Sequence, residues 1–176
     1  MMTKAVWVSI LLLFAAVSFS VNAGYGFNEA DLQKLRTTNQ CPGCDLSGAV
    51  IQAAKLSGAN LAGANLSSAS ISNSNLSGAN LSNANLNYVN LNNANLSGAN
   101  LTNANLRVAV LTNAKLQDAN LTNANLTGAA LWDANLTNAN LTNTTLTGAH
   151  LTDATWTDGT KCKEDSTGQC KKNKSD

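Results

Sequence analysis

The chain has few residues suited to acid–base or nucleophilic catalysis. It contains one histidine, His150, and two glutamates, Glu29 and Glu164. A general base must lie within hydrogen-bonding reach of the proton it removes, so the many serine and threonine hydroxyls have no evident partner to activate them. A glycine-rich phosphate-binding loop is absent as well. We therefore expect neither an enzyme nor a cofactor, and we interpret His150 as a solvated surface residue.

Charge is also scarce. Charged residues make up 12% of the chain, with 11 basic and 10 acidic side chains. Apart from Lys4 near the N-terminus, the two signs are therefore equal in number. An even balance creates no field that would attract a polyanion or imitate one. The sequence thus predicts no nucleic-acid partner.

What the chain has in abundance is a five-residue repeat, which runs without a gap over residues 44–158. A leucine recurs at every fifth position, and an alanine stands two residues before it. Stepping by five from Leu46 to Trp156 gives 23 copies. The leucine position is otherwise broken only by Ile51 and Ile71, and the alanine position by Cys44, Ser74, Val89 and Thr144. A repeat of this kind determines the fold and is considered before anything else.

The five-residue period excludes both regular secondary structures. On an α-helix five residues advance about 500°, so successive leucines would form no single face. On a straight strand an odd spacing would send alternate leucines to opposite faces. The pattern fits a chain that bends once per repeat, so that each unit is one side of a closed coil with its alanine and leucine turned inward. The inward hydroxyls of Ser74 and Thr144 should then bond to nearby backbone carbonyls, because an unpaired buried hydroxyl costs about 1–3 kcal/mol.

Two blocks, Ala59-Asn60-Leu61-Ala62-Gly63 and Ala99-Asn100-Leu101-Thr102-Asn103, show the pattern of a small residue, Asn, Leu, a small or hydroxyl residue and a variable fifth position. This resembles the pentapeptide-repeat proteins. The resemblance implies an all-β solenoid, a right-handed quadrilateral β-helix with four pentapeptides per coil and about six coils. At about 4.8 Å per coil the rod would be roughly 28 Å long. Some members of the family are acidic DNA mimics, but the array here carries too little charge for that role.

Residues 1–23 are predicted to be an export signal. Lys4 supplies a positive start, Ala5–Val17 an apolar stretch, and Val21-Asn22-Ala23 a small-residue cleavage site. The apolar stretch is shorter than the about 20 residues of a membrane span, although an uncleaved anchor is the alternative. We therefore expect no stable membrane insertion after cleavage. The destination would be the periplasm, the thylakoid lumen or the extracellular space.

Residues 24–43 are predicted to form an N-terminal cap on residues 44–158. Asn28 can cap a short helix from Glu29 to about Arg36, with Asp31 at the capping-box position. A β-helix exposes the core and the unpaired edge of its first coil unless something covers them. We expect the helix to do this and the protein to be a monomer. The alternative is an amphipathic helix that binds a partner.

The four cysteines form two pairs, Cys41 and Cys44 before the array and Cys162 and Cys170 after it. An even number in an exported protein indicates disulfides. A disulfide needs Cα atoms within about 7 Å, so ends about 28 Å apart cannot be bridged, and we expect the pairs Cys41–Cys44 and Cys162–Cys170 and no zinc site. The alternative is a redox-active CxxC motif at Cys41 and Cys44, which Asp45 disfavours because a low thiol pKa needs cationic surroundings.

Residues 159–176 are predicted to be a disulfide-closed loop, which blunts the edge of the last coil, and a disordered basic tail from Lys171. Trp156 would cover the last core layer. The entry Cys41-Pro42-Gly43-Cys44 and the exit Trp156-Thr157-Asp158-Gly159 resemble the ends of exported pentapeptide-repeat proteins. The tail could alternatively contact an anionic membrane, but its interleaved acids leave little positive charge.

A few outward positions of the array break its small, polar pattern. Stacking the sequence at 20 residues per coil brings these residues together across one corner of the middle coils: Tyr88, Arg107, Val108, Val110, Ala130 and Trp132. A contiguous apolar patch with aromatic and arginine members is typical of a binding surface, although isolated exposed apolar residues are common. A second set, Asp118, Asp133, Asp153 and Asp158, could attract a cation but is better explained as a solvated face. The sequence therefore predicts an exported, non-catalytic scaffold with an unknown protein partner; the alternative is a thiol–disulfide redox protein.

Overall fold

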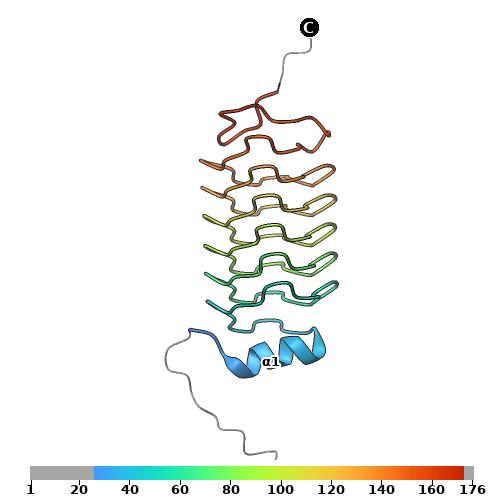
Figure 1. Cartoon of the computed structure of the whole chain (residues 1–176), viewed down its shortest axis with the longest axis vertical. Coiled ribbons are helices and arrows are strands. Elements are labelled where there is room, and N and C mark those ends of the chain that lie inside the picture. The colour runs from blue at the N-terminus through green and yellow to red at the C-terminus, as the bar shows by residue number, and fades with distance from the viewer. Residues whose placement is uncertain (1–25, 173–176) are drawn as a thin grey trace, which may run out of the picture.

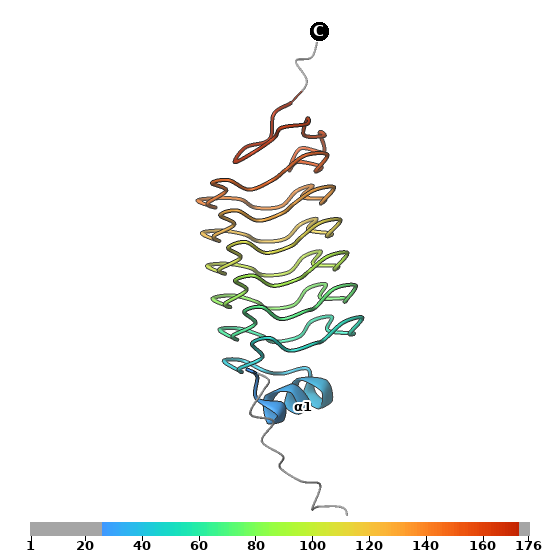
Figure 2. The same ribbon diagram turned by 60° about the vertical axis from the view of Figure 1, so that its left-hand side comes forward.

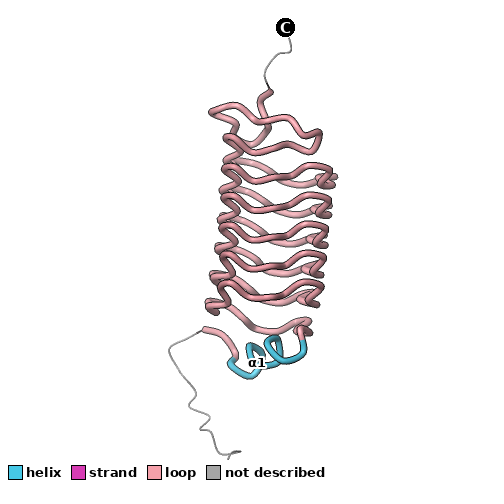
Figure 3. The backbone as a smooth tube through the Cα atoms, turned by 45° about the vertical axis from the view of Figure 1, so that its right-hand side comes forward, coloured by secondary structure: helices cyan, strands magenta, loops and turns pink. Residues whose placement is uncertain are grey.

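The computed structural model describes residues 26–172, so the predicted signal at 1–23 lies outside the described range. These residues form a rod of stacked coils that stands on helix α1 (Glu29–Thr38) (Figure 1). Over the described part of the chain the coils contain no continuous strands and are joined by isolated β-bridges, so they appear as loops in Figure 3. Each bridge in the array is parallel and joins residues 20 apart. Four pentapeptides therefore complete one turn, which confirms the predicted right-handed quadrilateral β-helix.

Three backbone hydrogen bonds on each side of the square join a coil to the next. The amides of Leu101 and Asn103 donate to the carbonyls of Asn120 and Thr122 in the coil above at 2.7 and 3.0 Å, and the amide of Asn120 donates to the carbonyl of Ala99 below at 2.9 Å. The same set of bonds repeats along the rod, so the coils lie directly over one another (Figure 2). The inward leucine and alanine side chains stack into one continuous buried core.

The corner between two sides follows from a left-handed residue two places after each leucine. This position is glycine or asparagine in most repeats, for example Gly98 and Asn103, with φ of 66° and 58°. Glycine and asparagine adopt this conformation at the lowest steric cost. After the corner, the amide of the next alanine donates to the preceding leucine carbonyl, as from Ala104 to Leu101 at 3.0 Å.

Polar ladders cover the outside of the rod. Asparagine amides donate to asparagine carbonyls one coil away, as from Asn103 to Asn83 and from Asn123 to Asn103. Threonine hydroxyls donate within their own repeat, as from Thr122 to Asn120 at 2.6 Å. These hydrogen bonds give partners to polar side-chain groups that neighbouring side chains partly shield from water.

The inward hydroxyls are paired as predicted. The Ser74 hydroxyl donates to the Ile51 carbonyl at 2.9 Å and accepts from the Ala54 amide at 3.0 Å. Thr144 donates to the Leu121 carbonyl at 2.7 Å. The serine thus bridges a donor and an acceptor of the coil below, in place of the direct bond that most other repeats make.

Helix α1 begins as predicted and extends two residues beyond the expected end, to Thr38. The Asn28 side chain accepts from the amide of Ala30 at 2.9 Å, and Leu32 and Leu35 are buried beneath the first coil. The expected capping box is wrong. The Asp31 carboxylate accepts from the amide of Asp45 at 2.8 Å, because the amide of Asn28 is already bonded to the carbonyl of Asp45.

The C-terminal segment turns back over the last coil. It pairs antiparallel with it through two bridges, Thr155 with Lys161 and His150 with Thr167, and it covers only part of the upper end. Leu141 and Leu146, on the uncovered sides, are only partly buried. Trp156 is partly buried against the core.

The basic tail begins in an ordered form. Lys172 forms an ion pair with Asp158, and residues 173–176 lie outside the described range. The Lys172 ammonium, followed by the hydroxyl and amide of Thr160, holds the pKa of the Asp158 carboxyl well below its usual value. The expectation of a disordered tail from Lys171 onward is therefore wrong for its first two residues.

Between Gly26 and Lys172 no helix has the length and apolar character needed to cross a membrane.

Candidate functional site

The structure brings the six predicted outward residues together on one corner of the rod. We call this set the outer patch; its members are Tyr88, Arg107, Val108, Val110, Ala130 and Trp132. A bridge joins Val110 to Ala130 in the next coil, and the amide of Tyr88 donates to the carbonyl of Arg107 at 3.0 Å. The outer patch therefore spans three neighbouring coils in the register that the 20-residue period predicts.

The apolar side chains of the outer patch are exposed to solvent. Tyr88 is 54% exposed, Trp132 41%, and Val108 and Val110 are each 38% exposed. Arg107 is exposed and Ala130 is partly buried. Among the residues described, the outer patch accounts for four of the five large hydrophobic side chains exposed in this way; the fifth, Val50, lies on the first coil.

Two members of the outer patch occupy left-handed corner positions. Tyr88 has φ of 57° and Val108 has φ of 56°. A β-branched or bulky residue in this region is a steric outlier. In the same column, the coils above and below carry the small residues Ser68, Gly128 and Gly148. The Val108 side chain leans toward Gly128, where an added Cβ would lie 3.7 Å from its Cγ2 atom.

A buried polar atom without a partner lies beside them. The side-chain oxygen of Asn87 is buried and accepts no hydrogen bond within the described residues. Asn87 precedes Tyr88 and lies one coil below Arg107. An unpaired buried acceptor costs about 1–3 kcal/mol. The outer patch thus contains two strained corners and lies beside one unsatisfied polar group.

The structure adds a residue that the sequence analysis left out. The rings of Trp132 and His150 are stacked, with centroids 5.1 Å apart and planes inclined by 20°. His150 is exposed as predicted, but it extends the outer patch by one coil through its bridge to Ala130. The 20-residue period could have shown this, since it places His150 directly above Ala130, two residues from Trp132.

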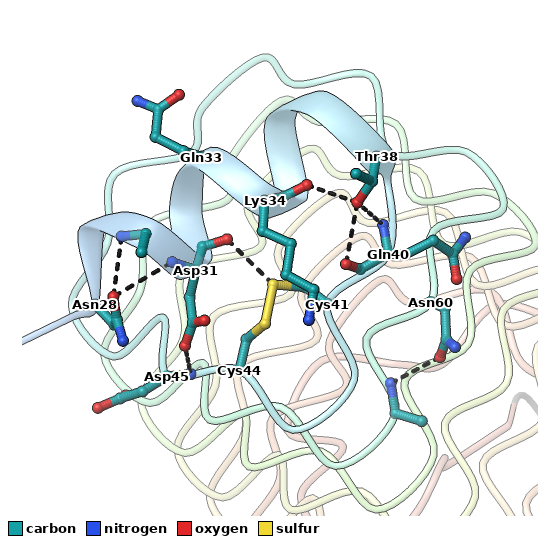
Figure 4. Close-up of a disulfide and its surroundings, with 12 residues drawn as sticks. Asn28, Asp31, Gln33, Lys34, Thr38, Gln40, Cys41, Cys44, Asp45 and Asn60 are labelled. Carbon is teal, nitrogen blue, oxygen red and sulfur yellow. Dashed lines mark hydrogen bonds between the residues drawn. A yellow bond between two sulfur atoms is a disulfide. The ribbon is translucent and has the colours of Figure 1, made fainter. Parts of the chain in front are cut away.

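The CxxC motif is closed as a disulfide within the first coil, next to α1 (Figure 4). The sulfur atoms of Cys41 and Cys44 are 2.04 Å apart, and both residues are buried. The Cys41 sulfur also lies 3.1 Å from the Asp31 carbonyl oxygen. Burial blocks attack by another thiol, and the neighbouring Asp31 carboxylate would disfavour a thiolate. This geometry is that of a structural crosslink.

The second disulfide closes the C-terminal loop. The sulfur atoms of Cys162 and Cys170 are 2.02 Å apart, so the four cysteines pair as the sequence predicts. In residues 26–172 one group of three metal-ligand types converges, Asp31 with Cys41 and Cys44, but its two sulfurs are bonded to each other. Asp133 and Asp153 belong to no such group in this part of the chain, which leaves the solvated-face interpretation in place.

The stacked coils, the buried leucine core and the exposed corner define a solenoid repeat protein, and comparison with known proteins gives its family. The model of the pentapeptide repeats matches residues 44–83, 74–113, 90–128 and 114–153. The chain therefore belongs to the pentapeptide-repeat family. Members of this family are in general non-enzymatic structural or interaction proteins.

Solved structures agree with this assignment. The chain is similar to HetL, a pentapeptide repeat protein involved in heterocyst differentiation regulation in the cyanobacterium Nostoc sp. strain PCC 7120, with 34% identity, a TM-score of 0.61, and coverage of 69% of this chain and 65% of HetL. It is also similar to Rfr23 from the cyanobacterium Cyanothece 51142, with 34% identity, a TM-score of 0.57, and coverage of 73% and 98%.

A further similarity is to QnrB1, a plasmid-mediated fluoroquinolone resistance protein, with 26% identity, a TM-score of 0.61, and coverage of 65% of this chain and 58% of QnrB1. The chain thus spans less than two thirds of the length of both HetL and QnrB1. A search of curated proteins finds no match.

Proposed function

We propose that the protein is an exported, non-catalytic scaffold that binds a protein partner through the outer patch. The observation that carries this proposal is the presence of Tyr88 and Val108 at left-handed corners. Glycine or asparagine would be more stable at either position, as in most other repeats. Natural sequences depart from such local rules mainly where function requires it.

The composition of the outer patch supports a protein partner. Aromatic and arginine side chains are enriched among the residues that dominate binding energy at protein interfaces, and Tyr88, Trp132 and Arg107 supply them. Their supports are rigid, because each side chain projects from a coil that is bonded to the coils above and below. A rigid surface loses little conformational entropy when it binds.

Export is part of the proposal. The predicted signal at residues 1–23 and the two disulfides support an oxidising compartment, since disulfides persist there and are rare in the cytosol. A fusion of residues 1–40 to a reporter that is active only after export tests this prediction. An inactive reporter would contradict it.

The binding test uses variants that should fold as well as the natural protein. Tyr88→Asn, Val108→Asn and Trp132→Thr install residues found at equivalent positions of other repeats, so the triple variant removes three of the four exposed large hydrophobic side chains of the outer patch and changes no buried core residue. Cross-linking in the native exported compartment, followed by pull-down, should recover a partner with the natural protein and lose it with the triple variant.

Lys115→Ser is the matched control, because it changes an exposed side chain outside the outer patch. It should leave the recovered partner unchanged. Equal recovery of the same partner by the natural protein and the triple variant would rule out binding through the outer patch.

A further inference from the structure

Helix α1 covers only part of the lower end of the rod. Where it lies beneath the first coil, it satisfies the coil's free edge. Asp45 donates its amide to Asp31 at 2.8 Å and accepts at its carbonyl from the amide of Asn28 at 2.9 Å. Past the end of the helix, the Asn39 side chain donates to the carbonyl of Ser57 at 3.0 Å. Between Ser47 and Ser57 the backbone of this edge makes no hydrogen bond to α1 or to any other described residue below it.

The uncovered edge runs from Val50 to Lys55. The amides and carbonyls of Val50 and Lys55, and the carbonyl of Gln52, have no hydrogen-bond partner in the described part of the chain. One coil higher, the equivalent groups are paired: the amide of Ser70 donates to Ala49, and its carbonyl accepts from Ile51. The edge therefore presents the donors and acceptors that a further length of extended chain would satisfy.

A cavity of about 530 Å³ adjoins this edge. We call the edge and the cavity together the basal groove. The apolar residues of its lining are Leu35, Val50, Ile51, Ala54 and Leu56. Val50, at 63%, is the most exposed large hydrophobic side chain among the described residues. The lining also holds two basic side chains, Arg36 and Lys55, and no acidic one. Thr37, Thr38, Asn39 and Gln52 complete the lining, so the groove combines apolar side chains with uncharged polar groups and two cations.

We propose that the basal groove binds a short, extended, acidic and apolar segment of a partner protein. The segment would pair its backbone with Val50 and Gln52, as an added strand pairs with a free sheet edge. An apolar side chain would enter the cavity against Val50 and Ala54, and a neighbouring carboxylate would face Arg36 and Lys55. This interface is separate from the outer patch and does not depend on it.

The features of the groove select this occupant over others. A helical partner would use its own amides and carbonyls internally and leave the edge unpaired, whereas an extended chain offers them. A segment of net positive charge would meet Arg36 and Lys55 without a compensating acid. An uncharged apolar segment would leave both cations without a counterion, so an acidic and apolar sequence makes the most complete set of contacts.

A defined peptide tests the proposal. The probe is a pentapeptide of alternating valine and glutamate, acetylated and amidated, added to the isotope-labelled protein. We expect NMR shifts at Val50, Gln52 and Lys55, and slower hydrogen exchange at the amide of Val50, which is the donor in the proposed pairing. The same peptide with lysine in place of glutamate should bind about tenfold more weakly. N-methylation of the peptide backbone should abolish the protection, because it removes the donors that pair with Val50 and Gln52.

Protein variants complete the test. Combined Arg36→Glu and Lys55→Glu should reverse the preference between the two peptides, whereas Lys34→Glu, on the same helix but outside the lining, should not. Tyr88→Asn should leave peptide binding unchanged, which separates this proposal from the proposed function. Three outcomes would each overturn the proposal. The first is no response at Val50 and Lys55 at millimolar peptide, and the second is equal binding of the lysine peptide. The third is protection that increases with protein concentration alone, which would indicate a second copy of the protein in the groove.

Discussion

At the residue scale, the corner after each leucine decides the balance between stability and surface chemistry. All these corners are left-handed, whether they carry Gly98 at φ 66° or Val108 at φ 56°. The backbone is therefore the same, and only the side chain sets the steric cost. Valine at this corner lowers the stability of the fold and places an exposed apolar group beside Tyr88. At this position the residue that would favour folding therefore differs from the one that would favour binding.

Val108→Asn should raise the free energy of unfolding by about 1 kcal/mol, because asparagine adopts the left-handed region with less strain than a β-branched residue. Urea unfolding followed by circular dichroism measures the change. Val110→Asn is a matched control, since Val110 is equally exposed but lies at a bridge position, where Asn90 stands one coil below. Its effect should stay within about 0.5 kcal/mol. A Val108→Asn variant less stable than the Val110→Asn variant would contradict the strain argument.

At the element scale, α1 serves as a substitute for a missing coil. Its Asp31 carboxylate takes the place of a backbone carbonyl, and the amide of Asn28 takes the place of a backbone donor. The helix thereby ends the ladder of hydrogen bonds at Asp45, and Leu32 and Leu35 cover the core from below.

Asp31→Ala should lower the free energy of unfolding by about 1–2 kcal/mol, because it removes a charged acceptor from the amide of Asp45. Gln33→Ala is the control. Its side chain is exposed and bonds only to Glu29, so it should change stability by less than about 0.5 kcal/mol. Chemical unfolding of both variants checks the expectation, and equal effects would show that the Asp31 contact contributes nothing specific.

The C-terminal loop makes a prediction about pH. Because Lys172 and Thr160 stabilise the charged form of Asp158, its pKa is lower in the folded than in the unfolded chain. The stabilisation is therefore complete at neutral pH and is lost as the pH falls below the unfolded pKa of about 3.9 and on through the folded value. NMR titration should show an Asp158 midpoint below about 3.9, and Lys172→Gln should move it upward. An unchanged midpoint in this variant would assign the shift to Thr160 alone.

The period of the array predicted the coils, the core and the outer patch because one inward leucine and alanine per side permit a single register. The ends were less predictable. Asp31 could bond within its helix or across to Asp45, and the choice depends on where the first coil lies. The partial cover over the last coil could not be predicted either. The repeat stops after Thr157, and the segment that pairs antiparallel with the last coil through Lys161 and Thr167 has no periodic pattern. The 20-residue period places His150 near Trp132, but it does not give the orientation of the two rings, so their stacking could not be predicted.

At the scale of the whole molecule, stability should vary along the rod. Each coil contacts only its neighbours, so a coil with one neighbour opens more readily than one with two. We expect the uncovered sides of the last coil to open first, because Leu141 and Leu146 are only partly buried there and their amides donate no hydrogen bond within the described chain.

Hydrogen exchange should therefore be fast at the amides of Leu141, Asn143 and Leu146 and slow at those of Leu101 and Leu106 in the middle coils, where each amide donates to the coil above. Exchange followed by NMR gives the rate at each position. Uniform protection along the rod would mean that the coils open together and that the upper end has no separate weakness.

The square cross-section also fixes the directions in which surface features face around the rod axis. A bridge always joins residues 20 apart, so inserting a whole coil in the middle would move the C-terminal loop about 4.8 Å along the axis without turning it. Inserting a single pentapeptide would instead rotate everything above it by a quarter turn, including the loop and any part of the outer patch beyond the insertion. The number of repeats between two surface features thus determines the direction in which each faces as well as the distance between them. The relative orientation of two partners bound to one rod would therefore depend on the number of pentapeptides between their binding surfaces.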